Sequence, residues 1–183
     1  MKTTDLSTFD NSDYNPGAGL PERVLWYFVN ACFFTSRWLP ISRFKVFLLK
    51  LFGAKIGKGV VIKPAVNIKY PWHLTIGNHV WIGENVWIDN LDKVSIGSHT
   101  TLSQGVMLLC GNHNYKSPSF DLITGAITLE DGVWIGAKSL VGPGVICRSH
   151  ALLSVQSVAT SDLEAYKIYR GNPAVFVKNR EIS

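Results

Sequence analysis

Large apolar residues recur every six positions along most of this chain. The spacing starts at Ile56, shifts by two residues before Ile76 and again before Ile96, and resumes at Leu129 after a long interruption. A six-residue period matches neither the 3.6-residue repeat of a helix nor the alternation of an ordinary strand. Short strands separated by tight turns do fit it, so the spacing predicts a parallel β-helix. The series is Ile56, Ile62, Ile68, Ile76, Ile82, Ile88, Ile96, Leu102, Leu108, Leu129, Ile135, Val141, Cys147, Leu153 and Ala159.

Three such units make one coil of a triangular prism, about eighteen residues long. The two-residue shifts at Leu74-Thr75 and Val94-Ser95 then fall once per coil, at the same corner. The large residues of the series fill the interior, and the glycine and polar positions between them form the corner turns. A second apolar or small residue follows most of the large ones at a distance of four positions, as Val80 follows Ile76.

The ends of the chain lack the repeat, and we expect three regions: 1–55, 56–163 with a loop at 111–126, and 164–183. The apolar and aromatic stretch 21–39 predicts a helix stopped by Pro40. Ser42 is a candidate N-cap for a second helix that runs to Phe52. We expect the segment from Ser161 onward to end as a helix or an extended tail.

The second N-terminal helix is amphipathic and admits two interpretations. It packs over the first coil or a neighbouring subunit, or its apolar and basic residues attach the protein peripherally to a membrane. The two roles are compatible. The apolar residues are Phe44, Phe47, Leu48 and Leu51, and the basic ones are Arg43, Lys45 and Lys50.

Composition narrows the class of protein. A chain of 183 residues fits one domain, and no uninterrupted apolar run is long enough for a spanning helix. The start, with Asp5 and Asp10, is not that of a signal peptide. The net charge of +5 is modest and no nucleic-acid-binding motif is present. The three cysteines have no metal-ligand spacing, which favours a reducing cytoplasm.

Several large side chains occupy the sixth position of a unit, which points away from the coil interior. Exposed rings in a row favour a covered face, and a symmetric homo-oligomer covers it most simply. The alternative is that the protein's own helices or loop cover them. These residues are Trp81, Trp87, Met107 and Trp134, and the equivalent place after Leu108 holds His113.

Three further stretches carry a family resemblance. They are Leu109-Cys110-Gly111-Asn112-His113-Asn114-Tyr115, Gly132-Val133-Trp134-Ile135-Gly136 and Gly171-Asn172-Pro173-Ala174. With the six-residue repeat they resemble the hexapeptide-repeat O-acetyltransferases of the colanic-acid-biosynthesis type, related to the galactoside and maltose acetyltransferases. The resemblance implies a left-handed β-helix, a homotrimer, acetyl-CoA as co-substrate and no required metal. It implies a sugar, nucleotide-sugar or lipid-linked saccharide as acceptor, in the cytoplasm or at the inner membrane, in surface-polysaccharide assembly.

His113 matches the catalytic histidine of that family. Acetyl-CoA is already an activated thioester, so the enzyme has to deprotonate and align a hydroxyl group. Histidine suits this task, because its unperturbed pKa near 6.5 leaves it largely neutral at about pH 7. The alternative is a solvated loop histidine. His79, His99 and His150 share a turn position in their units, which predicts exposed turn residues, and His73 is expected to pack beside Trp72.

The resemblance assigns further residues. Asn85 is expected at the acceptor or the oxyanion, although an asparagine in a turn needs no function. Trp87, Asp89 and Tyr115 are implied at the acceptor, and orientation of the base is the alternative role for Asp89. The coenzyme is expected in a channel between neighbouring prisms. The alternative role for Trp134 is packing within the trimer, and the alternative for the basic residues Lys178 and Arg180 is a solvated tail. The implied coenzyme contacts are Trp134, Gly136, Ala137, Ser154, Ser157, Lys178 and Arg180. Relatives often have Thr-Lys where this chain has Thr160-Ser161, which removes one phosphate contact.

Three other functions compete with this one. Serine O-acetyltransferases keep an Asp-His-Ala-Thr-Gly stretch, where this chain has Ile88-Asp89-Asn90-Leu91-Asp92. A γ-type carbonic anhydrase needs three histidines that converge on zinc. No closely spaced histidine pair accompanies His113. A purely structural β-helix would not need the sequence around His113.

Overall fold

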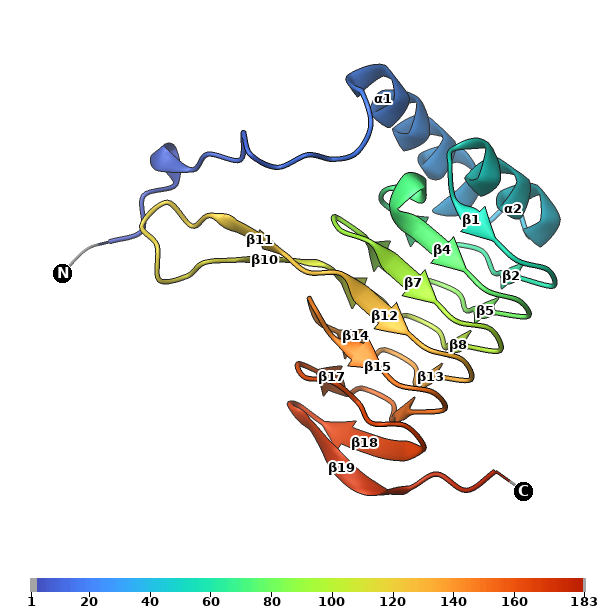
Figure 1. Ribbon diagram of the computed structural model, residues 1–183. Helices are drawn as coiled ribbons and strands as arrows, with labels where there is room; N and C mark the ends of the chain where they lie inside the picture. The colour runs from blue at the N-terminus through green and yellow to red at the C-terminus, as the bar shows by residue number, and fades with distance from the viewer. Residues whose placement is uncertain (1–2, 183) are drawn as a thin grey trace.

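A computed structural model describes residues 3–182 and shows the parallel β-helix that the repeat predicts (Figure 1). Three parallel sheets form the faces of a prism. Face A contains β1 (Lys55–Ile56), β4 (Leu74–Ile76), β7 (Val94–Ile96), β12 (Ile127–Leu129) and β15 (Ile146–Cys147). Face B contains β2 (Val61–Ile62), β5 (Trp81–Ile82), β8 (Thr101–Leu102), β13 (Trp134–Ile135), β16 (Leu152–Leu153), β18 (Lys167–Gly171) and β19 (Ala174–Asn179). Face C contains β3 (Asn67–Ile68), β6 (Trp87–Asp89), β9 (Met107–Leu109), β14 (Leu140–Val141) and β17 (Val158–Ala159).

The six-residue series forms the core, as predicted. Along face C, Ile68 pairs with Ile88, which pairs with Leu108, and all three side chains are fully buried. Equivalent residues of successive coils therefore stack directly on one another, and each coil buries its interior only against its two neighbours. The smaller residues four positions later are buried as well; Val80, Val86 and Val106 line the same interior at the corners.

The corners require unusual backbone conformations. His79, His99 and His150 have φ angles of 55°, 58° and 59°, in the left-handed region, so the prediction of turn positions is confirmed. His79 and His99 are exposed and stack with ring centroids 5.3 Å apart. His150 is half-buried against Tyr166. At the same corner a Cβ atom on Gly77 would lie 2.6 Å from the Ser98 nitrogen, which explains why glycine follows Ile76.

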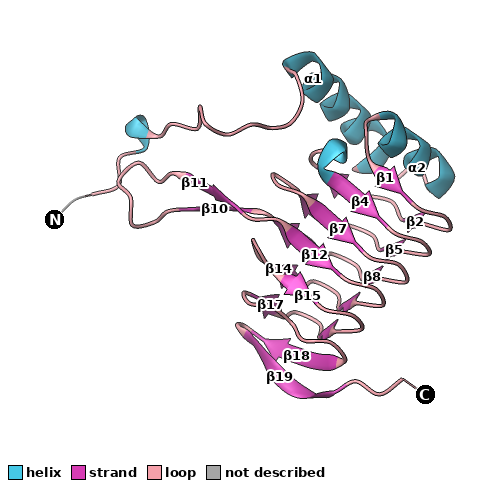
Figure 2. Ribbon diagram, viewed as in Figure 1, coloured by secondary structure: helices cyan, strands magenta, loops and turns pink. Residues whose placement is uncertain are grey.

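Two helices cover the N-terminal end of the prism: α1 (Leu20–Val29) and α2 (Ser42–Leu51) (Figure 2). The long helix expected over 21–39 is wrong in extent, because α1 passes into a π-helical turn, η2 (Asn30–Phe34), and the chain then leaves the helix before Pro40. The buried ring of Trp26 packs against Phe34 at 5.2 Å and Phe52 at 5.1 Å, which joins the two helices. The helical segment ends at Phe34, well before Pro40, so the proline does not set its end.

The hydroxyl of Ser42 does not cap α2. It accepts a hydrogen bond from the Ile62 nitrogen at 2.7 Å and so attaches the helix to the first coil. Lys45 lies on the same side and is fully buried, with its Nζ donating to the Lys63 carbonyl oxygen at 2.9 Å and lying 5.9 Å from the Phe34 ring centroid. Burial lowers the pKa of the Lys45 ammonium group. The Ser42 hydroxyl also donates to the Val60 carbonyl oxygen at 3.3 Å, so the inner side of α2 is held by packing and three hydrogen bonds to the prism.

The C-terminal segment differs from the expected helix or tail. β18 pairs in parallel with β16 and continues face B, and β19 folds back antiparallel to β18. Arg180 follows this hairpin and donates from Nη1 to the carbonyl oxygens of Gly132 and His150, both at 3.0 Å. The hairpin therefore closes the C-terminal end of the prism, opposite to α1 and α2 (Figure 1).

A second hairpin interrupts the prism between its third and fourth coils. It contains β10 (Gly111–His113) and β11 (Leu122–Thr124), which pair within the loop expected at 111–126 and project from the corner between faces C and A. The N-terminal segment, with η1 (Leu6–Thr8), reaches the tip of this hairpin, and η3 (Pro71–His73) lies at the same corner two coils earlier. Within residues 3–182, no helix combines the length and apolarity needed to cross a membrane.

Candidate active site

His113 lies at the end of β10, and its ring is held from two directions. Its Nδ1 lies 2.8 Å from the carbonyl oxygen of Phe120, and its ring stacks on the Phe120 ring with centroids 4.4 Å apart and planes 7° apart. A carbonyl oxygen can only accept, so Nδ1 carries the hydrogen, and in the neutral ring the lone pair is then on Nε2. This is the tautomer that a general base needs, with the orientation of the ring fixed by its neighbours.

The N-terminal strap, residues 5–16, contacts this hairpin and was not identified from the sequence. The backbone nitrogen of Asp5 donates to the Pro118 carbonyl oxygen at 2.8 Å, and the Phe9 ring lies 6.0 Å from that of His113. Farther along, the Tyr14 hydroxyl donates to the Leu91 carbonyl oxygen at 2.7 Å. Burial raises the pKa of Tyr14, which keeps the hydroxyl protonated as a donor. The strap therefore fixes the hairpin against the body of the prism.

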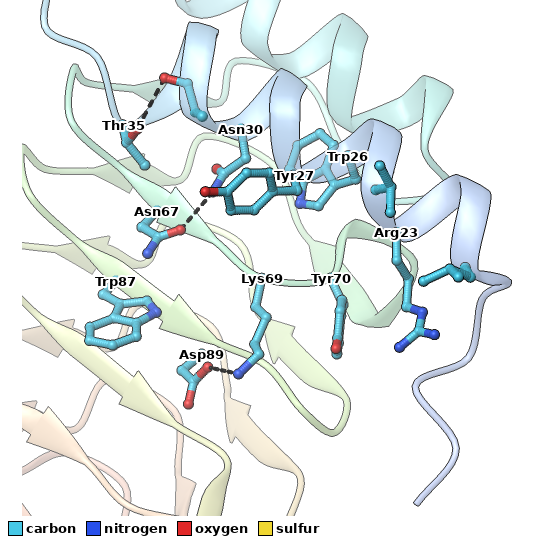
Figure 3. A pocket seen from close by; sticks show the side chains of 13 residues that line it. Arg23, Trp26, Tyr27, Asn30, Thr35, Asn67, Lys69, Tyr70, Trp87 and Asp89 are labelled. Carbon is cyan, nitrogen blue, oxygen red and sulfur yellow. Dashed lines mark hydrogen bonds and ion pairs between the residues drawn. The ribbon is translucent and has the colours of Figure 1, made fainter.

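A cleft of about 560 Å³ lies between α1 and face C (Figure 3). Asp89 forms part of it, is 7 % exposed, and pairs with Lys69 at 3.0 Å between Oδ1 and Nζ. In the strand register Asp89 lies beside Leu109, directly before the hairpin that bears His113. Aromatic rings with a few polar groups between them are typical of a site for a small polar molecule. The other lining residues are Leu20, Arg23, Val24, Trp26, Tyr27, Asn30, Ala31, Thr35, Asn67, Tyr70 and Trp87.

The residues expected at the acceptor therefore do not all lie in this cleft. Trp87 and Asp89 share the cleft, whereas Tyr115 lies on the hairpin near His113 and is 78 % exposed. Asn85 lies outside the cleft, at the corner between faces B and C, with φ of 57°. Its Oδ1 accepts a hydrogen bond from Arg37 Nη2 at 3.3 Å, which leaves its amide hydrogens available to another acceptor.

Most of the expected coenzyme residues lie on the other side of the prism. Gly136, Ala137, Ser154 and Ser157 all lie at the corner between faces B and C. Ser157 is fully buried, and its hydroxyl accepts a hydrogen bond from the Gly171 nitrogen at 3.0 Å, so this side chain supports the C-terminal hairpin. A Cβ atom on Gly136 would lie 2.6 Å from the Val155 nitrogen, so close coil packing explains this glycine.

The remaining expected coenzyme residues are on or next to face B. Trp134 is 43 % exposed and donates from Nε1 to Ser103 Oγ at 3.0 Å, so its ring lies along the outside of the prism. Lys178 is exposed on β19. The Arg180 guanidinium is engaged with the two backbone carbonyl oxygens described above, which leaves only part of its hydrogen-bonding capacity for a phosphate.

The expected base and the expected coenzyme contacts therefore do not meet within one chain. Each coil passes through faces A, B and C in turn, so the corner from which the His113 hairpin projects lies opposite face B. Trp134 points outward from face B, and the glycine and serine positions occupy the next corner. A reactive cleft that includes both sets needs a second copy of the chain.

No family model matches the sequence. The chain is, however, 37 % identical to a protein of Escherichia coli K12 that bears the name colanic acid biosynthesis acetyltransferase WcaF, over 96 % of this chain and 97 % of that protein. The chain belongs to this acetyltransferase family.

Solved structures agree with this family at the level of the fold. A hexapeptide-repeat acetyltransferase of Vibrio cholerae, crystallised with acetyl coenzyme A, is 16 % identical and superposes with a TM-score of 0.83 over 96 % of this chain and 97 % of its own. A galactoside acetyltransferase in complex with coenzyme A is 19 % identical, with a TM-score of 0.78 over 88 % and 82 %. The left-handed β-helix expected from the sequence is thereby confirmed for this acetyltransferase.

The remaining histidines of the acetyltransferase do not assemble a metal site. His73 lies beside Trp72, as expected, with ring centroids 6.4 Å apart. His79 and His99 stack on each other, and within residues 3–182 no three His, Cys, Asp or Glu side chains converge in a way that could hold a metal ion. The described part of the chain thus gives no support to the carbonic anhydrase alternative.

Proposed function

We propose that this acetyltransferase transfers the acetyl group of acetyl-CoA to a hydroxyl group of a sugar in surface-polysaccharide synthesis. The observation that carries the proposal is the setting of His113, whose Nδ1 is bonded to the Phe120 carbonyl oxygen and whose Nε2 is free to accept a proton. The family membership and the coenzyme A complexes of structural neighbours support acetyl-CoA as the donor. We expect the cytoplasm, where acetyl-CoA is available, to be the site of the reaction.

In the proposed reaction, His113 Nε2 takes the proton of the acceptor hydroxyl as its oxygen attacks the thioester carbonyl carbon. The imidazolium formed is stabilised by the Nδ1–H hydrogen bond to the Phe120 carbonyl oxygen. The tetrahedral intermediate then collapses, the C–S bond breaks, and the thiolate recovers the proton from Nε2. The free amide hydrogens of Asn85 are the proposed donors to the oxyanion, since its Oδ1 is already bonded to Arg37.

The cleft beside α1 is the proposed acceptor site. Trp87 and Tyr27 offer ring faces for a sugar, and Asp89 offers a carboxylate to its hydroxyl groups. Asp89 directly precedes the corner that carries His113 in the next coil, so an acceptor in the cleft extends toward the base. Tyr115, on the hairpin, is the proposed contact to the far side of the acceptor. A nucleotide-sugar and a lipid-linked saccharide both match this chemistry.

We further propose that the active unit is a homotrimer with the coenzyme between neighbouring prisms. Trp81, Trp87 and Trp134 are 60 %, 43 % and 43 % exposed on faces B and C, which is costly for an isolated chain. A cyclic trimer would cover part of these faces and bring the coenzyme residues of one copy to His113 of the next. Trp134, Gly136, Ala137, Ser154 and Lys178 are the proposed coenzyme contacts, with Arg180 contributing a partly engaged guanidinium.

The test is thiol release from acetyl-CoA with nucleotide-sugars, lipid-linked saccharides and L-serine as separate acceptors. His113→Ala should lower the rate by about 10²–10⁴, because a positioned base contributes that much. His99→Ala, a change to an exposed turn histidine, is the matched control and should retain the rate. Unchanged turnover by His113→Ala removes His113 as the base, and turnover with L-serine alone replaces the sugar with the serine acetyltransferase alternative.

A further inference from the structure

The N-terminal end of the prism presents an apolar surface that no part of residues 3–182 covers. Trp38, Ile41, Phe47 and Leu51 are between 57 % and 67 % exposed, and Phe44 is 37 % exposed. We call these five residues the cap surface. Phe44, Phe47 and Leu51 follow one another at spacings of three and four, so they form one stripe along α2. The Phe33 ring, 6.1 Å from Trp38 and 5.5 Å from Phe44, joins the loop residue to this stripe.

The cap surface is the outer side of a helix whose inner side is already satisfied. Lys45, Leu48 and Leu49 face the first coil and are buried. The exposed stripe is therefore additional to what the fold requires, since an ordinary surface helix places polar residues opposite its buried face. A patch of this kind normally marks a site of interaction with a partner or a membrane.

The charge around the cap surface has one sign. Between Glu22 and Glu84 the chain has nine Lys and Arg residues and no Asp or Glu. The whole chain has 18 basic and 13 acidic residues, so the remainder carries nine basic against thirteen acidic. Arg43 and Lys50 are exposed on α2 one row from the apolar stripe, and neither forms an ion pair within the described residues. The cap end is thus strongly positive, and the acidic excess of the chain lies in its other segments, mainly in residues 1–22 and 84–126.

We infer that the cap surface docks on an anionic lipid bilayer. Exposed Trp, Phe and Leu side chains enter the headgroup boundary, while Arg43 and Lys50 meet the anionic headgroups, which is the pattern of an interfacial amphipathic helix. A protein partner or a second copy would have to supply an acidic surface, and the acidic residues of this chain lie elsewhere, in and around the strap, the hairpin and the later coils. The bilayer supplies negative charge and an apolar layer together.

Docking on a bilayer would also bring the enzyme to a lipid-linked acceptor, and this link rests on the proposed function. The acceptor cleft lies beneath α1, at the same end of the prism as the cap surface (Figures 1 and 3). Leu20, Val24 and Tyr27 of α1 form the apolar side of that cleft, next to Arg23 and Lys69. A protein docked by its cap holds the cleft close to the bilayer, where a saccharide carried on a lipid would be presented. Vesicle binding itself does not depend on the acceptor.

The experiment measures flotation of the full chain with vesicles of phosphatidylcholine alone and of phosphatidylcholine with phosphatidylglycerol at 7:3, a composition chosen to resemble an anionic membrane surface. Binding should require phosphatidylglycerol and weaken as NaCl is raised, since salt screens charges at the surface. Arg43→Gln/Lys50→Gln should bind about 25-fold more weakly, because each basic residue contributes about fivefold. Phe47→Glu/Leu51→Glu should lose at least about 100-fold, because two apolar side chains leave the bilayer.

Val175→Glu/Ile182→Glu is the matched control. It adds the same two charges at exposed apolar positions, 61 % and 60 % accessible, at the opposite end of the prism, and should bind as the wild type does. Circular dichroism and thiol release with a soluble acceptor should be the same for all variants, since none lies in the proposed site. Equal vesicle binding by wild type and Phe47→Glu/Leu51→Glu overturns the inference.

Sedimentation velocity without vesicles tests the remaining alternative, that a second copy of the chain covers the cap surface. If Phe47→Glu/Leu51→Glu changes the assembly state of the protein, the cap surface is an interface between copies and the membrane inference is wrong. If the assembly state is unchanged and vesicle binding is lost, the inference stands, whatever acceptor the enzyme uses. Loss of activity in every variant with normal vesicle binding would instead count against the proposed function.

Discussion

Phe120 is the residue whose replacement most sharply separates the positioning of His113 from the stability of the fold. Its ring stacks on His113 at 4.4 Å, its backbone carbonyl oxygen binds Nδ1, and its φ angle of 54° is left-handed. Phe120→Gly removes the ring and leaves the carbonyl group. We therefore expect the histidine to keep its tautomer and to lose the surface that orients it.

The effects of Phe120→Gly on the free energy of unfolding partly cancel. Loss of the stacked pair costs about 0.5–1.5 kcal/mol. Relief of a left-handed non-glycine residue returns about 1–2 kcal/mol, and the greater freedom of glycine in the unfolded chain costs about 0.5–1 kcal/mol. The lost burial of the half-buried Phe120 ring adds about 1–1.5 kcal/mol to the cost, so the free energy of unfolding should fall by no more than about 3 kcal/mol. In catalysis nothing offsets the lost stack, so kcat should fall roughly 3- to 10-fold.

The assay is steady-state thiol release, with kcat and the KM for acetyl-CoA determined separately. Phe120→Gly should lower kcat and leave that KM unchanged, and Phe120→Tyr, which keeps the stacked ring, should restore kcat. His99→Gly is the control, because His99 is also left-handed, with φ of 58°, and stacks on His79 far from the hairpin. A wild-type kcat for Phe120→Gly, or an equal loss in His99→Gly, would refute the role given to the ring.

Two predictions concern the fold. Leu108→Ala, a truncation of a fully buried residue between Ile88 and Val141, should lower the free energy of unfolding by about 2–5 kcal/mol, measured by urea denaturation at fixed protein concentration; a loss below about 1 kcal/mol would contradict the stacked core. Burial lowers the pKa of Lys45 below its ordinary 10.5, so the folded protein releases this proton at lower pH than the unfolded chain does. Lys45 should therefore make the protein more stable as pH rises from the folded-state pKa toward 10.5, and Lys45→Met should lose that part of the pH dependence; identical pH profiles would argue against a buried ammonium group.

The sequence was sufficient for the prism because the repeat is local and strict. Ile62, Ile82 and Leu102 stack in register on face B as their spacing requires, and the smaller residues four positions after the large ones are buried. The left-handed corners were also foreseeable, since His79, His99 and His150 recur at one place in their units. The C-terminal β-hairpin was missed, although the Val and Phe residues of 174–177 and the Gly171-Asn172-Pro173 turn gave a signal for it.

The candidate site was predictable only in part. His113 was found through its resemblance to a family, whereas its partner at Phe120 depends on the shape of a hairpin that has no repeat. The contacts of Phe9 and Tyr14 join residues about 80 to 100 positions apart in the chain, and no local sequence pattern predicts such contacts. Arg180 has a structural role that the sequence did not indicate, since its Nη1 donates to two backbone carbonyl oxygens, while its expected contact with a phosphate stays a prediction.

The central claim is that the base and the coenzyme contacts of one reactive cleft come from two copies of the chain. Its most direct test is activity in mixed oligomers of His113→Ala and Ala137→Glu chains, where the second change places a carboxylate in the proposed coenzyme channel. Each variant alone should be inactive. Oligomers assembled from an equal mixture should recover roughly a quarter of the wild-type rate, since a cleft is intact only when the first variant supplies its coenzyme corner and the second its histidine. No recovery, from mixed oligomers shown to form, would contradict a cleft shared between copies.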